Sequence, residues 1–166
     1  AAAQQLRRVG HVVTVFEKDD KIGGLLVYGI PDFKLEKNIV SRRVEQLRAE
    51  GVEFWTGVNV GEYYSVKELR SSFDAILLAT GAQHARKLLV EGSDLEGVHY
   101  AMHYLPQRNR EVAGDSIPEK ERIESGSKKA VILGGGFTAA DCLGNLNRQG
   151  ADPHIYQFEL VDMVPR

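Results

Sequence analysis

The sequence predicts a three-layer α/β fold with a parallel sheet, built from two partial dinucleotide-binding units of the Rossmann type. Apolar runs typical of buried parallel strands lie at 11–16 and 130–133. A helix, a glycine, a strand and an acid follow one another at 1–17 and again at 138–159. This coarse duplication favours two β-α-β units of the Rossmann type.

The first part of the chain alternates helical and strand patterns, separated by glycine-bearing loops. Helix stops are expected at Gly10 and Gly51, and Ser65 with Glu68 forms a capping-box sequence that opens a short helix. The predicted elements are helix 1–8, strand 11–16, helix 35–50, strand 52–56, helix 65–72, strand 75–78 and helix 98–105.

The composition changes between residues 108 and 129, where charged residues, glycine, proline and serine replace the apolar periodicity. We predict a linker there, between a first unit at 1–107 and the start of a second unit at 130–166. The predicted elements of the second unit are strand 130–133, helix 137–148 and strand 154–158.

Composition narrows the functional classes. The chain has 166 residues, a formal net charge of −2 and 43% hydrophobic residues, so nothing favours a nucleic-acid or acidic membrane partner. No apolar run approaches the roughly 20 residues of a membrane span. Cys142 is the only cysteine, which excludes a disulfide framework and a four-cysteine cluster, and its place on an apolar helix face predicts a packing role. A cytoplasmic setting is expected.

The most informative short motif is a glycine turn between a strand and a helix. Gly134, Gly136 and Ala139 fit the pattern G-x-G-x-x-A, and Gly135 lies inside the turn. Gly134 would make the tight turn, Gly136 would let a pyrophosphate approach the backbone, and Ala139 would allow close packing of helix on strand. The helix N-terminus would then attract the phosphates. A purely structural turn is the alternative.

Two acids stand where a dinucleotide fold places the residue that binds a ribose hydroxyl. Glu17 ends the strand 11–16, and Glu159 lies roughly 20 residues beyond the second glycine turn. Either could instead be a solvated charge at a strand end. An acid at the second position favours NAD over NADP, whereas the nearby Arg166 favours NADP, so the sequence leaves both cofactors open.

One longer run is far more specific than any glycine pattern. Residues 22–37, IGGLLVYGIPDFKLEK, resemble the small (beta) subunit of NADPH-dependent glutamate synthase. The N-terminal flavin module of dihydropyrimidine dehydrogenase is similar. Further matching segments are 56–61, 79–82, 109–115 and 147–150.

The resemblance implies an oxidoreductase module that binds FAD and NADPH. In that family NADPH reduces FAD, and electrons pass through iron–sulfur clusters of the parent protein to a large subunit that makes glutamate. The residues that the resemblance places along FAD are Glu17, Lys18, Gly24, Leu25, Val60, Ala79, Thr80 and Gly81. Those that it places at the NADPH pyrophosphate are Gly135, Gly136, Phe137 and Thr138. It assigns no catalytic acid, base or nucleophile.

The chain also departs from the family. Phe137 stands where the family has Asp, so a bulky apolar group is expected to crowd the nicotinamide or to remove a polar contact. The first glycine fingerprint and the cysteine-rich domain are absent, which predicts an internal fragment whose strand 11–16 lacks its inner neighbour. A second chain, a rearranged sheet or further parent residues would cover that edge.

We therefore expect the 166-residue chain to bind FAD weakly, if at all, and to be inactive alone. A truncated, non-catalytic nucleotide-binding or assembly fragment is the alternative to an enzyme module.

Overall fold

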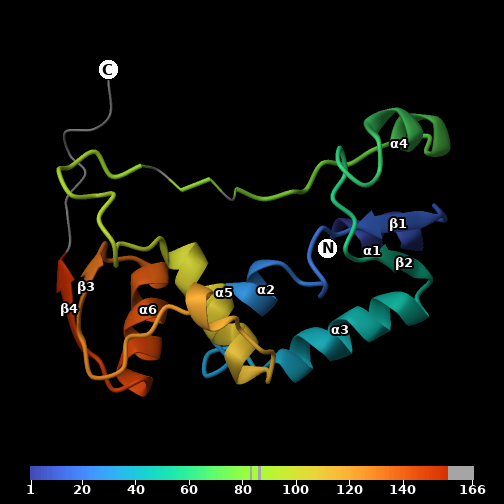
Figure 1. Ribbon diagram of the computed structural model, residues 1–166. Helices are drawn as coiled ribbons and strands as arrows, with labels where there is room; N and C mark the ends of the chain where they lie inside the picture. The colour runs from blue at the N-terminus through green and yellow to red at the C-terminus, as the bar shows by residue number, and fades with distance from the viewer. Residues whose placement is uncertain (83, 86, 157–166) are drawn as a thin grey trace. The chain divides into compact units, whose positions relative to one another are not determined.

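The computed structural model describes residues 1–82, 84–85 and 87–156, and its contacts form two compact units. Unit 1 comprises residues 1–27 and 35–84, and unit 2 comprises residues 28–34 and the chain from residue 85 onward. Each unit contains one two-stranded parallel sheet (Figure 1). This parallel pairing confirms the predicted α/β class.

Unit 1 is a β-α-β unit. Strand β1, Val13–Phe16, pairs in parallel with β2, Val52–Trp55, with Val13 opposite Val52. Parallel strands need a long crossover, and α3, Lys37–Ala49, provides it. Unit 1 also contains α1, Ala2–Arg8, which packs on both strands, and α4, Val66–Ser72. The single turn α2, Leu25–Tyr28, begins in unit 1, and its last residue belongs to unit 2.

Helix α1 is attached through polar contacts rather than through a large apolar face. The buried Gln4 donates hydrogen bonds of 2.8 Å to both carboxylate oxygens of Glu50, just beyond α3. Arg7 Nε donates to the Glu50 carbonyl at 3.0 Å. The hydrogen bonds from Gln4, together with nearby positive charges, lower the pKa of Glu50. These contacts fix α1 to the point where α3 turns into β2.

Unit 2 has a sheet, a helix beside it and a second helix beyond. Strand β3, Lys129–Leu133, pairs in parallel with β4, Asp152–Tyr156, through the crossover helix α6, Phe137–Arg148. Helix α6 packs on both strands, and α5, Ala101–Val112, packs on α6, so that α6 lies between the sheet and α5 (Figure 1). The buried core residues are Tyr104, Leu105, Ile132, Ala139, Cys142 and Leu146. Burial raises the pKa of the Cys142 thiol to about 11, which agrees with the predicted packing role.

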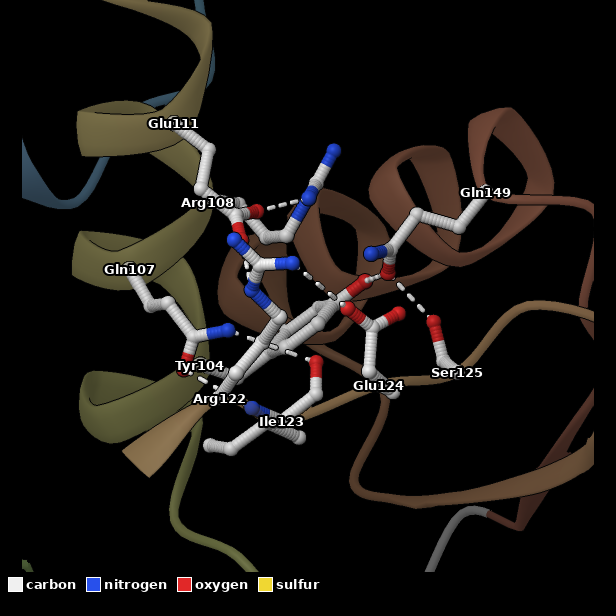
Figure 2. Close-up of polar contacts among 9 residues, drawn as sticks. All are labelled: Tyr104, Gln107, Arg108, Glu111, Arg122, Ile123, Glu124, Ser125 and Gln149. Atoms are coloured by element: carbon white, nitrogen blue, oxygen red, sulfur yellow. Dashed lines mark hydrogen bonds and ion pairs between the residues drawn. The ribbon is translucent and has the colours of Figure 1, made fainter. Parts of the chain in front are cut away.

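The segment that follows α5 is fixed to it by polar contacts (Figure 2). After the 3₁₀ turn η1, Glu119–Glu121, the backbone of Ile123 pairs with the Gln107 side chain, with Ile123 N donating to Oε1 at 2.9 Å. Tyr104 donates to Gln149 Oε1 at 2.6 Å, and Ser125 donates to the same oxygen. Residues 108–112 of the predicted linker therefore belong to α5, and Ile123 and Ser125 are hydrogen-bonded to residues of α5 and of the end of α6.

Residues 28–34, which we call the docking segment, pack within unit 2 although they come from an early part of the chain. Pro31 is almost completely buried, and so is Tyr28. Asn109 of α5 donates a buried hydrogen bond of 2.9 Å to the Tyr28 carbonyl. The guanidinium carbon of Arg110 lies over the Tyr28 ring, 4.8 Å from the centre of the ring.

Helix α6 holds the other end of the docking segment. The guanidinium of Arg148 lies 3.6 Å from the centre of the Phe33 ring. A Cβ at Gly144 would overlap Cζ of that ring, so glycine is needed for this close approach. Lys34 forms an ion pair with Asp141, also on α6.

The predicted bounds of several elements need correction, among them those of strand 11–16, which begins at Val13. Residues 75–78 are not a strand: this stretch has no ladder partner among the described residues, and its side chains are exposed, Leu78 at 81%. Apolar residues favour a strand, but only a neighbouring backbone completes one. The predicted helix 98–105 begins at Ala101 and continues to Val112 with Pro106 inside it. Strand β4 begins at Asp152, two residues earlier than predicted, and residues 157–158 lie outside the described part.

The contacts divide the chain between residues 84 and 85 and give residues 28–34 to unit 2. The predicted division into 1–107, 108–129 and 130–166 concerns cofactor-binding units, and it stays a prediction.

Replacing Gly144 by Ala should destabilise unit 2, because the Phe33 ring must move away from Arg148 to make room. We expect the free energy of unfolding to fall by about 1–3 kcal/mol, measured by urea denaturation. The same change in a Phe33→Ala background removes the clash and should be neutral or stabilising by up to about 1 kcal/mol, since Ala is the better helix former. Equal losses in both backgrounds would contradict the packing argument.

Candidate functional site

The glycine turn connects β3 to α6 in unit 2. Gly134 has a φ of +131°, a conformation that side chains other than glycine rarely adopt, and its N–H donates to the Tyr156 carbonyl at 2.9 Å. Gly136 is the N-cap of α6 with ordinary extended dihedrals, φ −83° and ψ −171°. The backbone therefore requires glycine at Gly134 but not at Gly136.

Among the residues that the structure describes, none fills the space in front of the turn. A Cβ built at Gly134 or at Gly136 would meet no atom of those residues within 4 Å, apart from its own chain neighbours. The N-cap supplies no side-chain hydrogen bond to α6, so no side-chain cap competes for the first N–H groups of the helix. An anion could approach these groups without displacing a side chain of the described residues. This arrangement is what a phosphate site at a helix N-terminus needs.

The residues around the turn lie as the motif predicts. Ala139 is buried in the core that α5, β3 and α6 share, as expected of a residue that packs inside the fold. Gly135 and Thr138 are exposed. Phe137, the first residue of α6, is 89% exposed, so it contributes little to the core and stands free at the helix entrance.

Glu17 lies at the carboxyl end of β1, in unit 1. Its N–H donates to the Trp55 carbonyl and its carbonyl accepts from Val58 N–H, both at 2.9 Å. Its Oε1 atom accepts a hydrogen bond of 3.0 Å from Asp19 N–H. The carboxylate thus organises the turn after β1, whether or not it also binds a ribose. Lys18 beside it is exposed.

The other predicted FAD residues are spread over the loops of unit 1. Gly24 precedes α2 with a φ of +52°, and Leu25, the first residue of α2, is exposed. Val60 forms an isolated bridge with Tyr64. The remaining predicted residues, Ala79, Thr80 and Gly81, are exposed and outside any strand.

The structure thus brings Gly134–Thr138 together at the start of α6, and it joins the Glu17 turn to the loop that leads to Val60. Glu159 and Arg166 lie outside the described residues, and their roles stay predictions.

Asp141 is a buried acid near the glycine turn, and sequence reasoning did not single it out. It lies on α6 one turn beyond Phe137, and Lys34 of the docking segment pairs with it. An acid among apolar residues of an amphipathic helix is the signal that could have indicated a buried charge in need of a partner. Sequence spacing could not have identified Lys34 as that partner.

Among the described residues, no group of three or more His, Cys, Asp or Glu side chains is arranged to hold a metal ion.

The described helices are each too short or too polar to cross a bilayer.

The sequence profile of the pyridine nucleotide-disulphide oxidoreductases matches the chain over residues 1–166. The chain belongs to this family. The glutamate synthase [NADPH] small chain of Mycobacterium tuberculosis is 53% identical over 99% of the chain and 34% of that relative. The corresponding small chain of Bacillus subtilis is 46% identical over 99% of the chain and 33% of its own length. These relatives confirm the resemblance that residues 22–37 predict.

The solved structures agree on the fold. Mycobacterium tuberculosis FprA in complex with NADPH has a TM-score of 0.73 and 24% sequence identity, and the match covers 93% of the chain and 39% of FprA. The chain spans about a third of the length of the curated glutamate synthase small chains that it matches.

The two glycines of the turn should respond differently to alanine. Gly134→Ala forces a residue with a side chain into a φ of +131°, so we expect the free energy of unfolding to fall by about 1–3 kcal/mol. Gly136→Ala adds a methyl group in open space at an ordinary backbone conformation, so we expect a change within about 0.5 kcal/mol. Thermal unfolding of both variants checks this, and a similar loss in Gly136→Ala would contradict the assignment.

Proposed function

We propose that this chain is the nucleotide-binding part of an NADPH-dependent flavin oxidoreductase of the glutamate synthase small-chain type. The observation that carries the proposal is the open glycine turn at the N-terminus of α6, in a chain that the family profile matches throughout. The two bacterial relatives described above are glutamate synthase [NADPH] small chains, which favours NADPH over NADH.

The residues of the turn fit a dinucleotide. Gly134 holds the turn, the missing side chain of Gly136 leaves room for the pyrophosphate, and the first N–H groups of α6 point toward it. Thr138 offers an exposed hydroxyl in the first turn of the helix. Phe137 lies beside the same entrance, where its ring would crowd the nicotinamide.

Bound FAD would accept a hydride from NADPH, and the contribution of the protein would be to position the two cofactors. The proposed FAD contacts remain Glu17, Lys18, Gly24, Leu25, Val60, Ala79, Thr80 and Gly81, and Glu159 and Arg166 remain candidates for the NADPH ribose. In the parent protein, electrons would continue through iron–sulfur clusters to the large glutamate synthase subunit, in the cytoplasm.

Weak FAD binding by this chain alone is also part of the proposal. Within the described residues β1 pairs only with β2, so the other edge of the strand that precedes Glu17 lacks a ladder partner. A second function, as an assembly module without catalysis, is favoured by the exposed apolar side chains of Ile76, Leu77 and Leu78. Self-association through the open sheet edge would be its simplest form.

The proposed function is tested by titrating the purified chain with NADPH and with NADH, using nucleotide fluorescence. We expect NADPH to bind, and Gly136→Ala to weaken binding about tenfold or more, because its methyl group occupies the approach to the pyrophosphate. Asn147→Ala, an exposed change at the other end of α6, is the matched control and should leave the affinity unchanged.

A flavin absorbance scan after mixing with FAD completes the test. Absorbance that bleaches on NADPH addition supports the enzyme module, whereas nucleotide binding without bleaching favours the assembly module. Absence of NADPH binding by the folded chain would refute the proposed site.

A further inference from the structure

A negative charge is buried one helical turn from the start of α6, whose N-terminus is the proposed phosphate site. Asp141 follows Phe137 by one helical turn on α6, and only 8% of its surface is exposed. Its Oδ1 atom is buried. The ammonium group of Lys34 lies against this oxygen in an ion pair. Lys34 is thus the charged group that compensates Asp141 there.

The docking segment fixes Lys34 in this position. The neighbouring Phe33 ring lies against Gly144 and Arg148 on the same helix, and Pro31 is almost completely buried. The backbone on the N-terminal side of Lys34 is therefore anchored, so the lysine needs to order only its own side chain to reach Asp141. The Lys34 side chain remains 38% exposed, which means that water partly screens the pair.

An unpaired carboxylate in this position would oppose anion binding. The N-terminus of α6 attracts a phosphate through its N–H groups and the positive end of the helix dipole. A full negative charge on Asp141, one turn away, would offset the attraction of the helix N-terminus for a phosphate. The protein that surrounds this carboxylate screens its charge less than water would. The ammonium group of Lys34, paired with Asp141, cancels this negative charge and so preserves the attraction for a phosphate.

We propose that Lys34 determines the nucleotide affinity of the site by neutralising Asp141, without contacting the nucleotide. The proposal rests on the proposed function, since it concerns the same helix N-terminus. It makes Lys34 a positioning and charge-balancing residue. It also gives residues 28–34 a role in nucleotide binding that is separate from their packing.

A charge cycle on the chain tests the proposal, with NADPH affinity measured at low and at high salt. Lys34→Met should weaken binding about threefold to tenfold at low salt, and the loss should shrink as salt rises. Asp141→Asn should bind at least as tightly as the original chain. The double variant should regain the original affinity within about twofold, since no net charge is left beside the site.

Two further variants separate charge from structure. Lys34→Arg keeps the positive charge and should retain the original affinity. Lys128→Met removes an exposed lysine elsewhere in unit 2 and should have no effect on binding. Thermal unfolding of every variant shows whether an affinity change follows a loss of structure.

Each result of these binding measurements supports or refutes the role of Lys34. If folded Lys34→Met binds as tightly as the original chain while Gly136→Ala binds weakly, this inference fails and the proposed function stands. If the double variant remains as weak as Lys34→Met, Lys34 contacts the nucleotide directly and the inference fails. If Lys34→Met does not fold, a loss of affinity in Asp141→Asn would refute the inference. If the original chain binds no NADPH, the proposed function and the inference fail together.

Discussion

Unit 2 depends on the packing of the docking segment against α5 and α6. Residues 28–34 carry the buried Pro31, and their backbone receives the buried hydrogen bond from Asn109 on α5. Phe33 and Lys34 attach the same segment to α6. Because α5 and α6 both contact it, the segment fixes the helix whose N-terminus faces the proposed phosphate site. Without it, the buried Asp141 would lose its cation, and a buried charge without a partner is strongly unfavourable.

Local features of the fold could be predicted from the sequence. Ser65 and Glu68 form the expected capping box, and Gly134, Gly136 and Ala139 lie where a strand–turn–helix motif places them. Each depends only on neighbours within a few residues. Strand 75–78 and the extent of α5 could not be predicted in this way. A strand exists only with a partner backbone, and tertiary contacts keep α5 helical past Pro106 despite the cost of a proline.

The ion pair between Lys34 and Asp141 could not be predicted, because it joins residues that are far apart in the sequence. Nothing in the spacing of Lys34 and Asp141 indicates that they meet, since their pairing follows from the seating of a whole segment. The structure also suggests why residues 22–37 form such a specific sequence run. It contains the predicted flavin residues Gly24 and Leu25, and it also contains the segment that packs on α5 and α6. A change within this run can therefore affect packing, charge balance and cofactor contacts together.

The hydrogen bond from Asn109 to the Tyr28 carbonyl joins residues that are 81 positions apart. Contacts of such long range are slow to form, because a large loop must close before any stabilisation is gained. During synthesis the docking segment leaves the ribosome before α5 and α6 have been made. Until then, its apolar side chains are exposed to water or form transient contacts. Unit 2 is therefore discontinuous along the chain, and the residues from 85 onward, expressed by themselves, would lack part of their own core.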